Sequence, residues 1–218
     1  MPDMPEKPSV TQQIAPRVDI AFRLSAKLAP LDHGYALFGA ICRIAGDLHG
    51  AKWLAVHPLS GSPRPDGLLA VDARRGLRLR IEPAEIPRVL PLAGKRLEID
   101  GHTAHVGVSA VYALEPAAAL HARIVVIKGF TEPEPFREAL RRQLDAMEVK
   151  ARVEIGRRRR MAVNGYTVVG FETTLHELTE EGSLRAQCAG LGGKQRMGCG
   201  VLVPVGRRPP LGARRGDA

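Results

Sequence analysis

The sequence predicts an α+β protein built from two tandem ferredoxin-like (RRM-like) domains, each with the element order βαββαβ. Two observations lead to this prediction. Strand and helix patterns occur twice along the chain in the same order, and 218 residues accommodate two units of roughly 100 residues each. We expect residues 16–116 to form the N-terminal domain and residues 117–205 to form the C-terminal domain. The polar, proline-rich start (1–15) and the basic tail (206–218) are expected to be flexible.

The first repeat begins with a strand at residues 17–24, where polar and apolar residues alternate. A helix follows, capped by Asp32. Its apolar face at helical spacing consists of Leu37, Ala40, Ile41 and Ile44. The elements expected to complete this repeat are strands at 68–72 and 77–81, a proline-started helix over 83–92 that ends at Gly94, and strands at 96–100 and 103–114.

The second repeat begins with another alternating strand, over residues 121–128. A helix starts at about Pro135, and the apolar residues on one side of it are Phe136, Leu140, Leu144 and Met147. The remaining expected elements are strands at 150–155 and 166–173, a short helix over 179–189 and a last strand at 201–205.

The charge balance indicates a polyanionic partner. Lys and Arg number 32 against 23 Asp and Glu, which gives a formal net charge of +9. A basic excess of this size favours nucleic acid over a membrane surface or an acidic protein. Only nine aromatic residues are present, too few for a protein that reads single strands mainly through base stacking.

Several classes of protein are excluded by what the sequence lacks. No apolar stretch approaches the roughly 20 residues of a membrane span. The opening MPDMPEKPSV has no apolar core of the kind a secretory signal needs. Cys42, Cys188 and Cys199 lie far apart with no CxxC pair, which argues against a disulfide framework and a thiolate zinc site. We therefore expect a cytoplasmic protein with no metal site and no cofactor.

The sharpest local motif is the Gly-rich loop, residues 190–200, with Lys194 and Arg196 at its centre. Its glycines are Gly190, Gly192, Gly193, Gly198 and Gly200. Glycines let a backbone approach phosphate and expose its N–H groups, while the two cations neutralise charge. A dinucleotide fingerprint would follow the first strand of a βαβ unit, and a Walker loop would need Ser or Thr after Gly-Lys. The alternative is a flexible loop.

An uninterrupted run of arginines lies between two expected strands, where we expect a hairpin tip. The run consists of Arg157, Arg158, Arg159 and Arg160, and no acidic residue occurs between Gly182 and Gly216. Such a run alone is often a solvated turn. Together with the Gly-rich loop it favours a nucleic-acid track, with Arg78 and Arg80 as weaker candidates.

Histidines are the candidates for proton transfer. His33, His49 and His57 cluster around the first helix, and no HExxH spacing occurs. The other histidines are His102, His105, His121 and His176. RNA can be cut by its own 2′-hydroxyl if a base, an acid and a cation surround the phosphate. The pattern leaves open which histidine, if any, is catalytic.

With these residues in view, the chain resembles the Cas6 family of CRISPR repeat-processing endoribonucleases. GLGGKQRMGCGVLVP is similar to the family's signature loop, GxGxxxxxGxG, which precedes the last strand. PLDHGYALFGAICRIAGDLHGAKW is similar to its first-helix region, which ends in Leu-His followed shortly by Lys. PLAGK and ARIVVIKGFTEPEPF further resemble the branch found with myxobacterial-type type I systems.

The resemblance implies a metal-independent cut within each repeat of the precursor transcript, leaving 5′-hydroxyl and 2′,3′-cyclic phosphate ends. It implies His49 as the catalytic histidine and Lys52 as a support for the phosphate charge. His33 is the rival or the partner in a dyad, and His57 is the third candidate. Cys42 stands where some members have Tyr. Lys194 and Arg196 would hold the RNA backbone. The implied partners are repeat RNA and other Cas subunits of a type I effector complex, and the alternative is a non-catalytic RNA-binding subunit.

Overall fold

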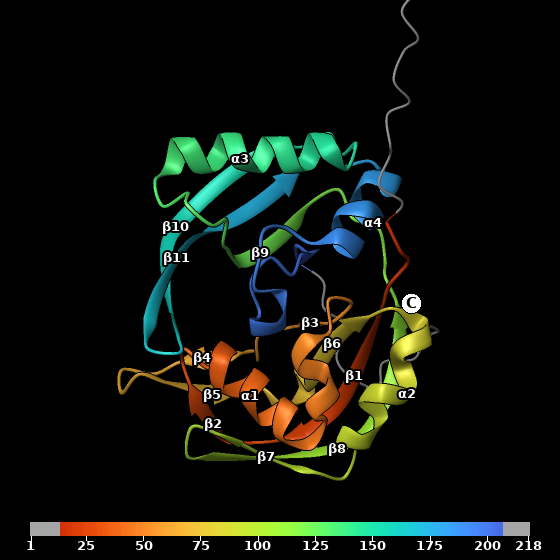
Figure 1. The fold of residues 1–218 in the computed structure, drawn as a ribbon, viewed down its shortest axis with the longest axis vertical. Helices are drawn as coiled ribbons and strands as arrows, with labels where there is room; N and C mark the ends of the chain where they lie inside the picture. The colour runs from red at the N-terminus through yellow and green to blue at the C-terminus, as the bar shows by residue number, and fades with distance from the viewer. Residues whose placement is uncertain (1–13, 207–218) are drawn as a thin grey trace, which may run out of the picture.

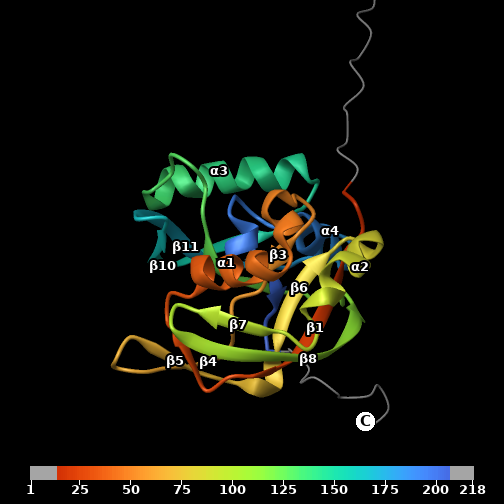
Figure 2. The ribbon, with the colours of Figure 1, turned by 60° about the horizontal axis from the view of Figure 1, so that its bottom comes forward.

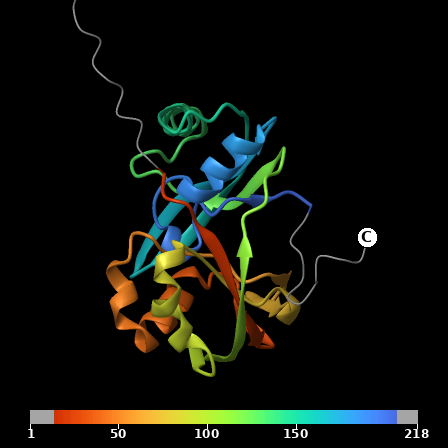
Figure 3. The ribbon, with the colours of Figure 1, turned by 90° about the vertical axis from the view of Figure 1, so that its right-hand side faces the viewer.

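Two antiparallel sheets, one from each half of the chain, carry the fold, in agreement with the predicted tandem ferredoxin-like units. The structure is a computed structural model that describes residues 14–206. The second half, with its helix α3, is stacked on the first half in both the front and the side view (Figures 1 and 3). The segments expected to be flexible fall almost entirely on residues 1–13 and 207–218, outside the described residues.

The second half has the fully antiparallel strand order of a ferredoxin-like unit, in which the first strand lies between the third and the fourth. The sheet order is β10-β11-β9-β12. The elements are β9 (Leu120–Val125), α3 (Pro133–Ala146), β10 (Arg152–Val163), β11 (Tyr166–His176), α4 (Glu180–Ala189) and β12 (Val203–Pro204). Every element predicted for this half is therefore present in the predicted order.

Packing explains why the helices of this half form where they do. Phe136, Leu140 and Leu144 of α3 are buried against Phe171 and Leu175 of β11. At the start of α4, the Thr179 side chain accepts a hydrogen bond from the Gly182 amide at 3.0 Å, which satisfies one of the unpaired donors of a helix N-terminus.

The arginine run lies inside a strand, which corrects the prediction of a hairpin tip. β10 runs through residues 157–160, and the turn that joins it to β11 is Asn164-Gly165, with φ of 48° and 78°. Two consecutive left-handed residues give the turn that best fits the twist of a hairpin, and Asn-Gly is its preferred sequence. Arginines are tolerated in β10 because it is an edge strand, where charged side chains discourage pairing with other chains.

The first half contains a five-stranded sheet of order β3-β6-β1-β8-β7. Its strands are β1 (Val18–Ser25), β3 (Ala55–Val56), β6 (Leu77–Ile81), β7 (Arg96–Ile99) and β8 (His102–Ala113). Helix α1 (Gly34–Ile44) covers this sheet and contributes Leu37, Phe38 and Ile41 to the buried core. The predicted apolar face of the first helix is thereby confirmed at Leu37, Ala40 and Ile41, which are all buried.

Two elements of the first half differ from the prediction. The strand at 68–72 forms as β5 (Leu68–Val71), but it pairs with β2 (Leu28–Pro30) and β4 (Gly61–Pro63) in a separate sheet. Figure 2 shows β4 and β5 at one end of the first half. The place beside β6 is taken by β3, whose two residues are too few to show a period.

The predicted helix over 83–92 is the second difference. It consists of three short turns, namely the 3-10 turn Pro83–Glu85, α2 (Ile86–Val89) and the 3-10 turn Leu90–Leu92. Each turn has a proline at its start, at Pro83, Pro87 and Pro91. A proline lacks the amide donor and clashes with the preceding turn, so one continuous helix is interrupted twice.

Asp32 does not cap α1 as predicted. The N-cap residue is His33, with no side-chain capping bond. The Asp32 carboxylate instead accepts the backbone amide of Ala162 in β10 at 2.7 Å. This contact joins the segment before α1 to the arginine-bearing hairpin of the other half.

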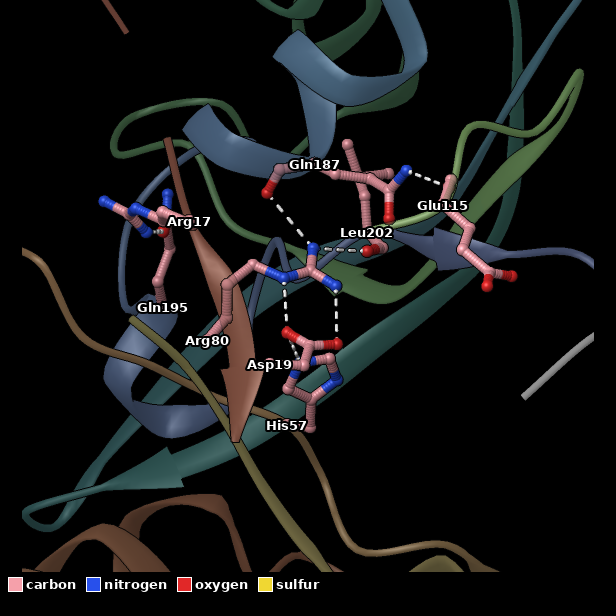
Figure 4. A network of polar contacts seen from close by, with 8 residues as sticks. All are labelled: Arg17, Asp19, His57, Arg80, Glu115, Gln187, Gln195 and Leu202. Atoms are coloured by element: carbon pink, nitrogen blue, oxygen red, sulfur yellow. Dashed lines mark hydrogen bonds and ion pairs between the residues drawn. The ribbon is translucent and has the colours of Figure 1, made fainter. Parts of the chain in front are cut away.

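A buried ion-pair network holds the two halves together (Figure 4). Arg80, 2% exposed, donates to both carboxylate oxygens of Asp19 at 2.8 and 3.1 Å, and His57 Nε2 lies 3.1 Å from the same carboxylate. Arg80 Nη1 also donates to the carbonyls of Gln187 and Leu202 in the second half, at 3.1 and 2.7 Å. Arg80 is therefore a structural residue and not an RNA contact.

Arg78, the other weaker candidate on β6, is also buried, at 5% exposure. Its guanidinium carbon lies 5.0 Å from the centre of the Tyr112 ring. Each half has its own apolar core, one within residues 20–106 and the other within 120–202. On that basis we propose the domain division between 116 and 117, in the segment that joins β8 to β9.

Candidate functional site

The Gly-rich loop lies between the two halves (blue, centre of Figure 1) and includes a short 3-10 turn, Gln195–Met197. The turn contacts both α1 and β3 of the first half. A Cβ on Gly34 of α1 would lie 2.3 Å from the Met197 carbonyl oxygen, so helix and loop are in direct backbone contact. The loop and β10 are thus the parts of the second half that contact the first helix.

The amides of the loop glycines point inward, which corrects the expectation that they face phosphate. The amides of Gly190, Gly192, Gly193, Gly198 and Gly200 donate, in that order, to Ala186 O, Gln143 Oε1, Val126 O, Gln195 O and Ile124 O. Gly190, Gly192 and Gly200 are needed for close packing, since a Cβ added there would lie 2.6, 2.2 and 1.7 Å from the nearest atom. A Cβ on Gly200 would lie 1.7 Å from the Leu191 carbonyl oxygen, and φ there is +66°.

His49 and Arg196, one from each half, both contact the ring of Phe38. The His49 ring is stacked on Phe38, with centroids 6.1 Å apart and planes at 21°. The Arg196 guanidinium carbon lies 5.4 Å from the same ring centroid, within range of a cation–π contact. Phe38 is 4% exposed on α1, so it is a fixed support for both side chains.

The charge on Arg196 is only partly satisfied by the protein. Its Nη1 is buried and has no hydrogen-bond partner among residues 14–206. A buried donor without a partner is costly, and an anionic ligand would remove that cost. His49 lies at the surface in the 3-10 turn Gly46–Gly50 that follows α1, so its side chain is exposed to solvent.

His33 is placed very differently from His49. It is fully buried, its Nδ1 lies 2.9 Å from the Pro30 carbonyl, and its Nε2 accepts the Leu59 amide at 2.8 Å. Burial, with the nearby charge of Arg123, lowers the pKa of His33 to about 4. Both ring nitrogens bind backbone groups, of Pro30 and Leu59, so the neutral imidazole has a structural role.

Lys52 is exposed three residues after His49 and borders a cavity of 590 Å³ between the halves.

Cys42, on α1, lies near Arg196. Burial raises the pKa of its thiol even though the Arg196 charge opposes that shift. The Cys42 thiol is therefore held in its neutral form and not activated as a nucleophile.

The arginine run borders a second cavity, of 640 Å³, which we call the arginine groove. It is lined by Arg158, Arg159 and Arg160 together with Arg123, Asp32 and the loop residues Met197 and Gly198. Arg159 is ion-paired with Glu172, whose pKa is lowered by hydrogen bonds from Arg159 and from the Arg157 amide against the opposing effect of its own burial. The Arg159 Nε is buried without a hydrogen-bond partner among the residues described.

Arg123 is a residue that sequence reasoning missed. The register of β9 against β11 shifts between Ala122 and Val125, as a β-bulge does, and such bulges re-aim side chains. Arg123 donates to the Leu31 carbonyl at 3.1 Å, and burial with the charge of Arg159 lowers its pKa. The available signal was a single arginine within an apolar strand. Phe38 was missed because it is not part of the apolar face that helical spacing indicated for the first helix.

Neither a metal cluster nor a membrane span is found in the part of the chain that the structure describes. Within residues 14–206 no three His, Cys, Asp or Glu side chains are grouped as a metal site requires. None of the helices there is long and apolar enough to cross a membrane.

Cys199 is buried in the Gly-rich loop, and this burial raises the pKa of its thiol to about 12.

Comparisons with known proteins agree on one family. A model of the Cas6 CRISPR family matches residues 18–207. The chain is 39% identical over 190 residues to the CRISPR-associated endonuclease Cas6 of Myxococcus xanthus, which covers 87% of this chain and 82% of that protein.

Two solved structures have the same fold at low sequence identity. A Cas6-related protein from Pyrococcus furiosus superposes with a TM-score of 0.64 at 14% identity, covering 88% of this chain and 100% of that one. A RAMP protein described as binding different RNA substrates superposes with a TM-score of 0.60 at 12% identity. The match covers 85% of this chain and 97% of that one.

Proposed function

The chain belongs to the Cas6 family, and we propose that it is an endoribonuclease that cleaves CRISPR precursor RNA within its repeats to give mature guide RNAs. In the proposed reaction the ribose 2′-hydroxyl attacks the adjacent phosphorus and the bond from phosphorus to the 5′-oxygen breaks. The products carry a 2′,3′-cyclic phosphate and a 5′-hydroxyl, and no metal ion takes part. The observation that carries this proposal is that His49 of the first half and Arg196 of the Gly-rich loop both contact the same ring, Phe38.

The reaction needs a base for the 2′-hydroxyl proton, an acid for the 5′-oxygen and a cation for the charge that develops on the phosphorane. We assign one of the two proton transfers to His49, because histidine is the side chain best suited to exchange protons near neutral pH. Arg196 is assigned to the phosphorane charge, since its Nη1 is buried without a partner in the described residues. Lys52, exposed and three residues from His49, is assigned to the same charge.

His33 is proposed as a positioning residue. Its ring joins the Pro30 carbonyl to the Leu59 amide immediately before α1, the helix that carries Phe38. A change at His33 would act on the catalytic cluster through that helix.

RNA backbone contacts are proposed on both sides of the Gly-rich loop. Lys194 is exposed in the loop, and the arginine groove, bordered by Arg158, Arg159, Arg160 and Arg123, reaches Met197 at the loop itself. Arg157 is exposed on the same strand. Proteins bind duplex RNA mainly through phosphate and 2′-hydroxyl contacts, which these cations would supply. The five glycines shape the loop that presents Lys194 and Arg196.

The decisive experiment is cleavage of a repeat RNA, taken from the CRISPR array of the same genome, in buffer containing EDTA. The wild type is expected to cut once per repeat and to leave a cyclic phosphate. His49→Ala is expected to slow the cut about 10²- to 10⁴-fold, the usual contribution of general acid–base catalysis, with RNA affinity unchanged. The matched control is His105→Ala, which removes another exposed histidine of the first half, on β8.

Each other outcome has its own meaning. Cleavage that requires added metal would refute the metal-independent mechanism. Binding without cleavage would favour a non-catalytic repeat-RNA-binding subunit. Equal loss of activity in His49→Ala and His105→Ala would remove the assignment of His49.

We also propose that the protein acts in the cytoplasm and associates with other Cas subunits of a type I effector complex, as the family resemblance implies. Purification of the protein from its native cells, with its bound RNA and proteins identified, tests this association. Recovery of guide RNA with no other Cas subunit would contradict it.

A further inference from the structure

The cavity of 590 Å³ beside the Gly-rich loop has the features of a ligand pocket. It is lined by Arg17, Lys52, Trp53 and Glu82 of the first half, and by Gln143 of α3 and Gln195 of the loop. Its volume lies within the range of roughly 300–1,000 Å³ that is usual for small-ligand sites. One aromatic ring, two cations, a carboxylate and two side-chain amides therefore converge on it.

Trp53 supplies a fixed aromatic surface. It is the single tryptophan of the chain, and it is half-buried against the apolar core of the first half. The guanidinium carbon of Arg88 lies 4.9 Å from the centre of its ring, a cation–π contact that restrains it further. A ring held in this way loses little freedom when a second flat ring stacks on it.

The amide of Gln143 is oriented by the loop. Its Oε1 accepts the Gly192 amide at 2.9 Å, and among residues 14–206 its Nε2 donor has no partner. Arg17 is close to Gln195, but its hydrogen bond to Gln195 Oε1 is long, 3.5 Å (Figure 4). A donor at Gln143 and a weakly bound guanidinium at Arg17 are thus available to a ligand.

We propose that this cavity binds a single nucleotide of the RNA substrate. The base stacks on Trp53, its edge accepts a hydrogen bond from Gln143 Nε2, and its phosphate lies between Arg17 and Lys52. This inference rests on the proposed function, since it takes RNA to be the substrate. Extruded bases bound by stacking and by edge hydrogen bonds are the usual means of sequence-specific RNA recognition.

The position of the cavity defines which nucleotide it reads. Lys52 lines it and is three residues from His49, and Gln195 lines it and is adjacent to Arg196. The bound nucleotide is therefore close to the phosphate that is cut. The cavity would set the base preference at a position beside the cleavage site.

Trp53 makes the proposal directly measurable, because the intrinsic tryptophan emission of the protein comes from this residue alone. The wild-type protein is titrated with a repeat RNA made uncleavable by 2′-deoxy substitution at the cut. A series of RNAs that each lack one base is then compared. Quenching by the intact RNA is expected, with loss of quenching when one base, at or next to the cut, is absent.

Two variants test the roles of the side chains. Trp53→Leu is expected to weaken binding of the intact RNA roughly 5- to 100-fold, the effect of losing one base–aromatic stack, while Trp53→Phe restores most of it. Gln143→Glu keeps an oxygen for the Gly192 amide but removes the donor, so it is expected to change the preferred base at that one position. Gln143→Ala serves as the comparison that loses both groups.

The outcomes separate this proposal from the proposed function. Tight RNA binding with unchanged Trp53 emission for every RNA would overturn the pocket and leave the nuclease intact. Quenching that no single base deletion relieves would also overturn it, because the ring would then be sensing RNA in general. Absence of RNA binding altogether would refute both.

Discussion

Arg80 and Asp19 form a buried bidentate ion pair on neighbouring strands of the first half, and the same guanidinium holds two carbonyls of the second half. The position of the Gly-rich loop relative to α1 depends on this arrangement, because Gln187 and Leu202 lie on either side of the loop in the chain. The ion pair therefore supports the placement of Arg196 against Phe38, the ring that His49 also contacts.

Asp19→Asn is expected to destabilise the protein strongly. Removing one partner leaves the buried Arg80 charge uncompensated, which typically costs about 3–5 kcal/mol. Urea unfolding followed by circular dichroism measures this change. The matched control is Asp66→Asn, which breaks an exposed pair with Arg64 and is expected to change stability far less, because solvent screens that pair. Similar losses in the two variants would contradict the structural role of the network.

Asp19 also makes stability depend on pH in the acid range. The His57 and Arg80 charges hold its pKa well below the usual range, although burial alone would raise it. Its contribution to stability is then complete above the pKa of an unfolded Asp, about 4, and is lost as the pH falls toward the lower folded value. Asp19→Asn should flatten the stability curve in that range.

His33 adds a second dependence, at higher pH. Its pKa is lowered from 6.5 to about 4 in the folded protein, so the unfolded chain binds the additional proton between these values. The free energy of unfolding should fall as the pH drops from 6.5 to 4, by an amount on the order of 3 kcal/mol. His33→Gln is expected to remove this slope, and an unchanged slope in that variant would show that another group is responsible.

Gly200→Ala is expected to disrupt the loop, and Gly193→Ala is its matched control. The new Cβ at position 200 would lie 1.7 Å from the Leu191 carbonyl, whereas at position 193 the nearest atom would be 4.0 Å away. Only Gly200 of the two has a left-handed φ, of +66°. The unfolding temperature and the RNA affinity should both fall in Gly200→Ala and change little in Gly193→Ala. Equal behaviour of the two would mean that the loop adjusts freely.

Lys194→Gln combined with Arg196→Gln is expected to weaken RNA binding and to reduce its salt dependence. If each cation contacts one phosphate, the slope of log affinity against log salt should fall by about 1.4 to 1.8. Arg74→Gln combined with Arg96→Gln removes the same charge from exposed sites elsewhere in the first half. If the control variant lowers the slope of log affinity against log salt by the same amount, the effect comes from net charge and not from the loop.

The strength of local signals explains which parts of the fold were predictable. The second half was predicted in type and order because its strands and helices, apart from the two-residue β12, are long enough to show a period. β3 has only two residues, and its place in the sheet is decided by pairing with β6, which no local pattern reveals. The Asn164-Gly165 turn was an available signal, but four consecutive charged residues suggested a loop where an edge strand accommodates them.

The candidate site was only partly predictable for a related reason. The residue pattern alone does not distinguish His33 from His49, and only the family resemblance favours His49. Burial separates them in the structure, because Leu59 folds back to donate its amide to His33. The inward direction of the glycine amides depends on acceptors at Val126 and Ile124, far away in the chain. Contacts of this kind are properties of the packed protein, and they distinguish a catalytic candidate from a structural residue of the same type.

The network of Asp19, Arg80 and Leu202 has a consequence for how the protein is made. A ribosome synthesises Asp19 among the early residues and Leu202 among the last of those described, so the guanidinium acquires its final acceptor only when nearly all of residues 14–206 exist. A nascent chain that lacks the segment around Leu202 already contains His49. It still lacks the hydrogen bond from Arg80 to the Leu202 carbonyl, which helps to position the Gly-rich loop. The ability to cut RNA would then arise late in translation, and fragments released early would be inert toward the transcripts around them.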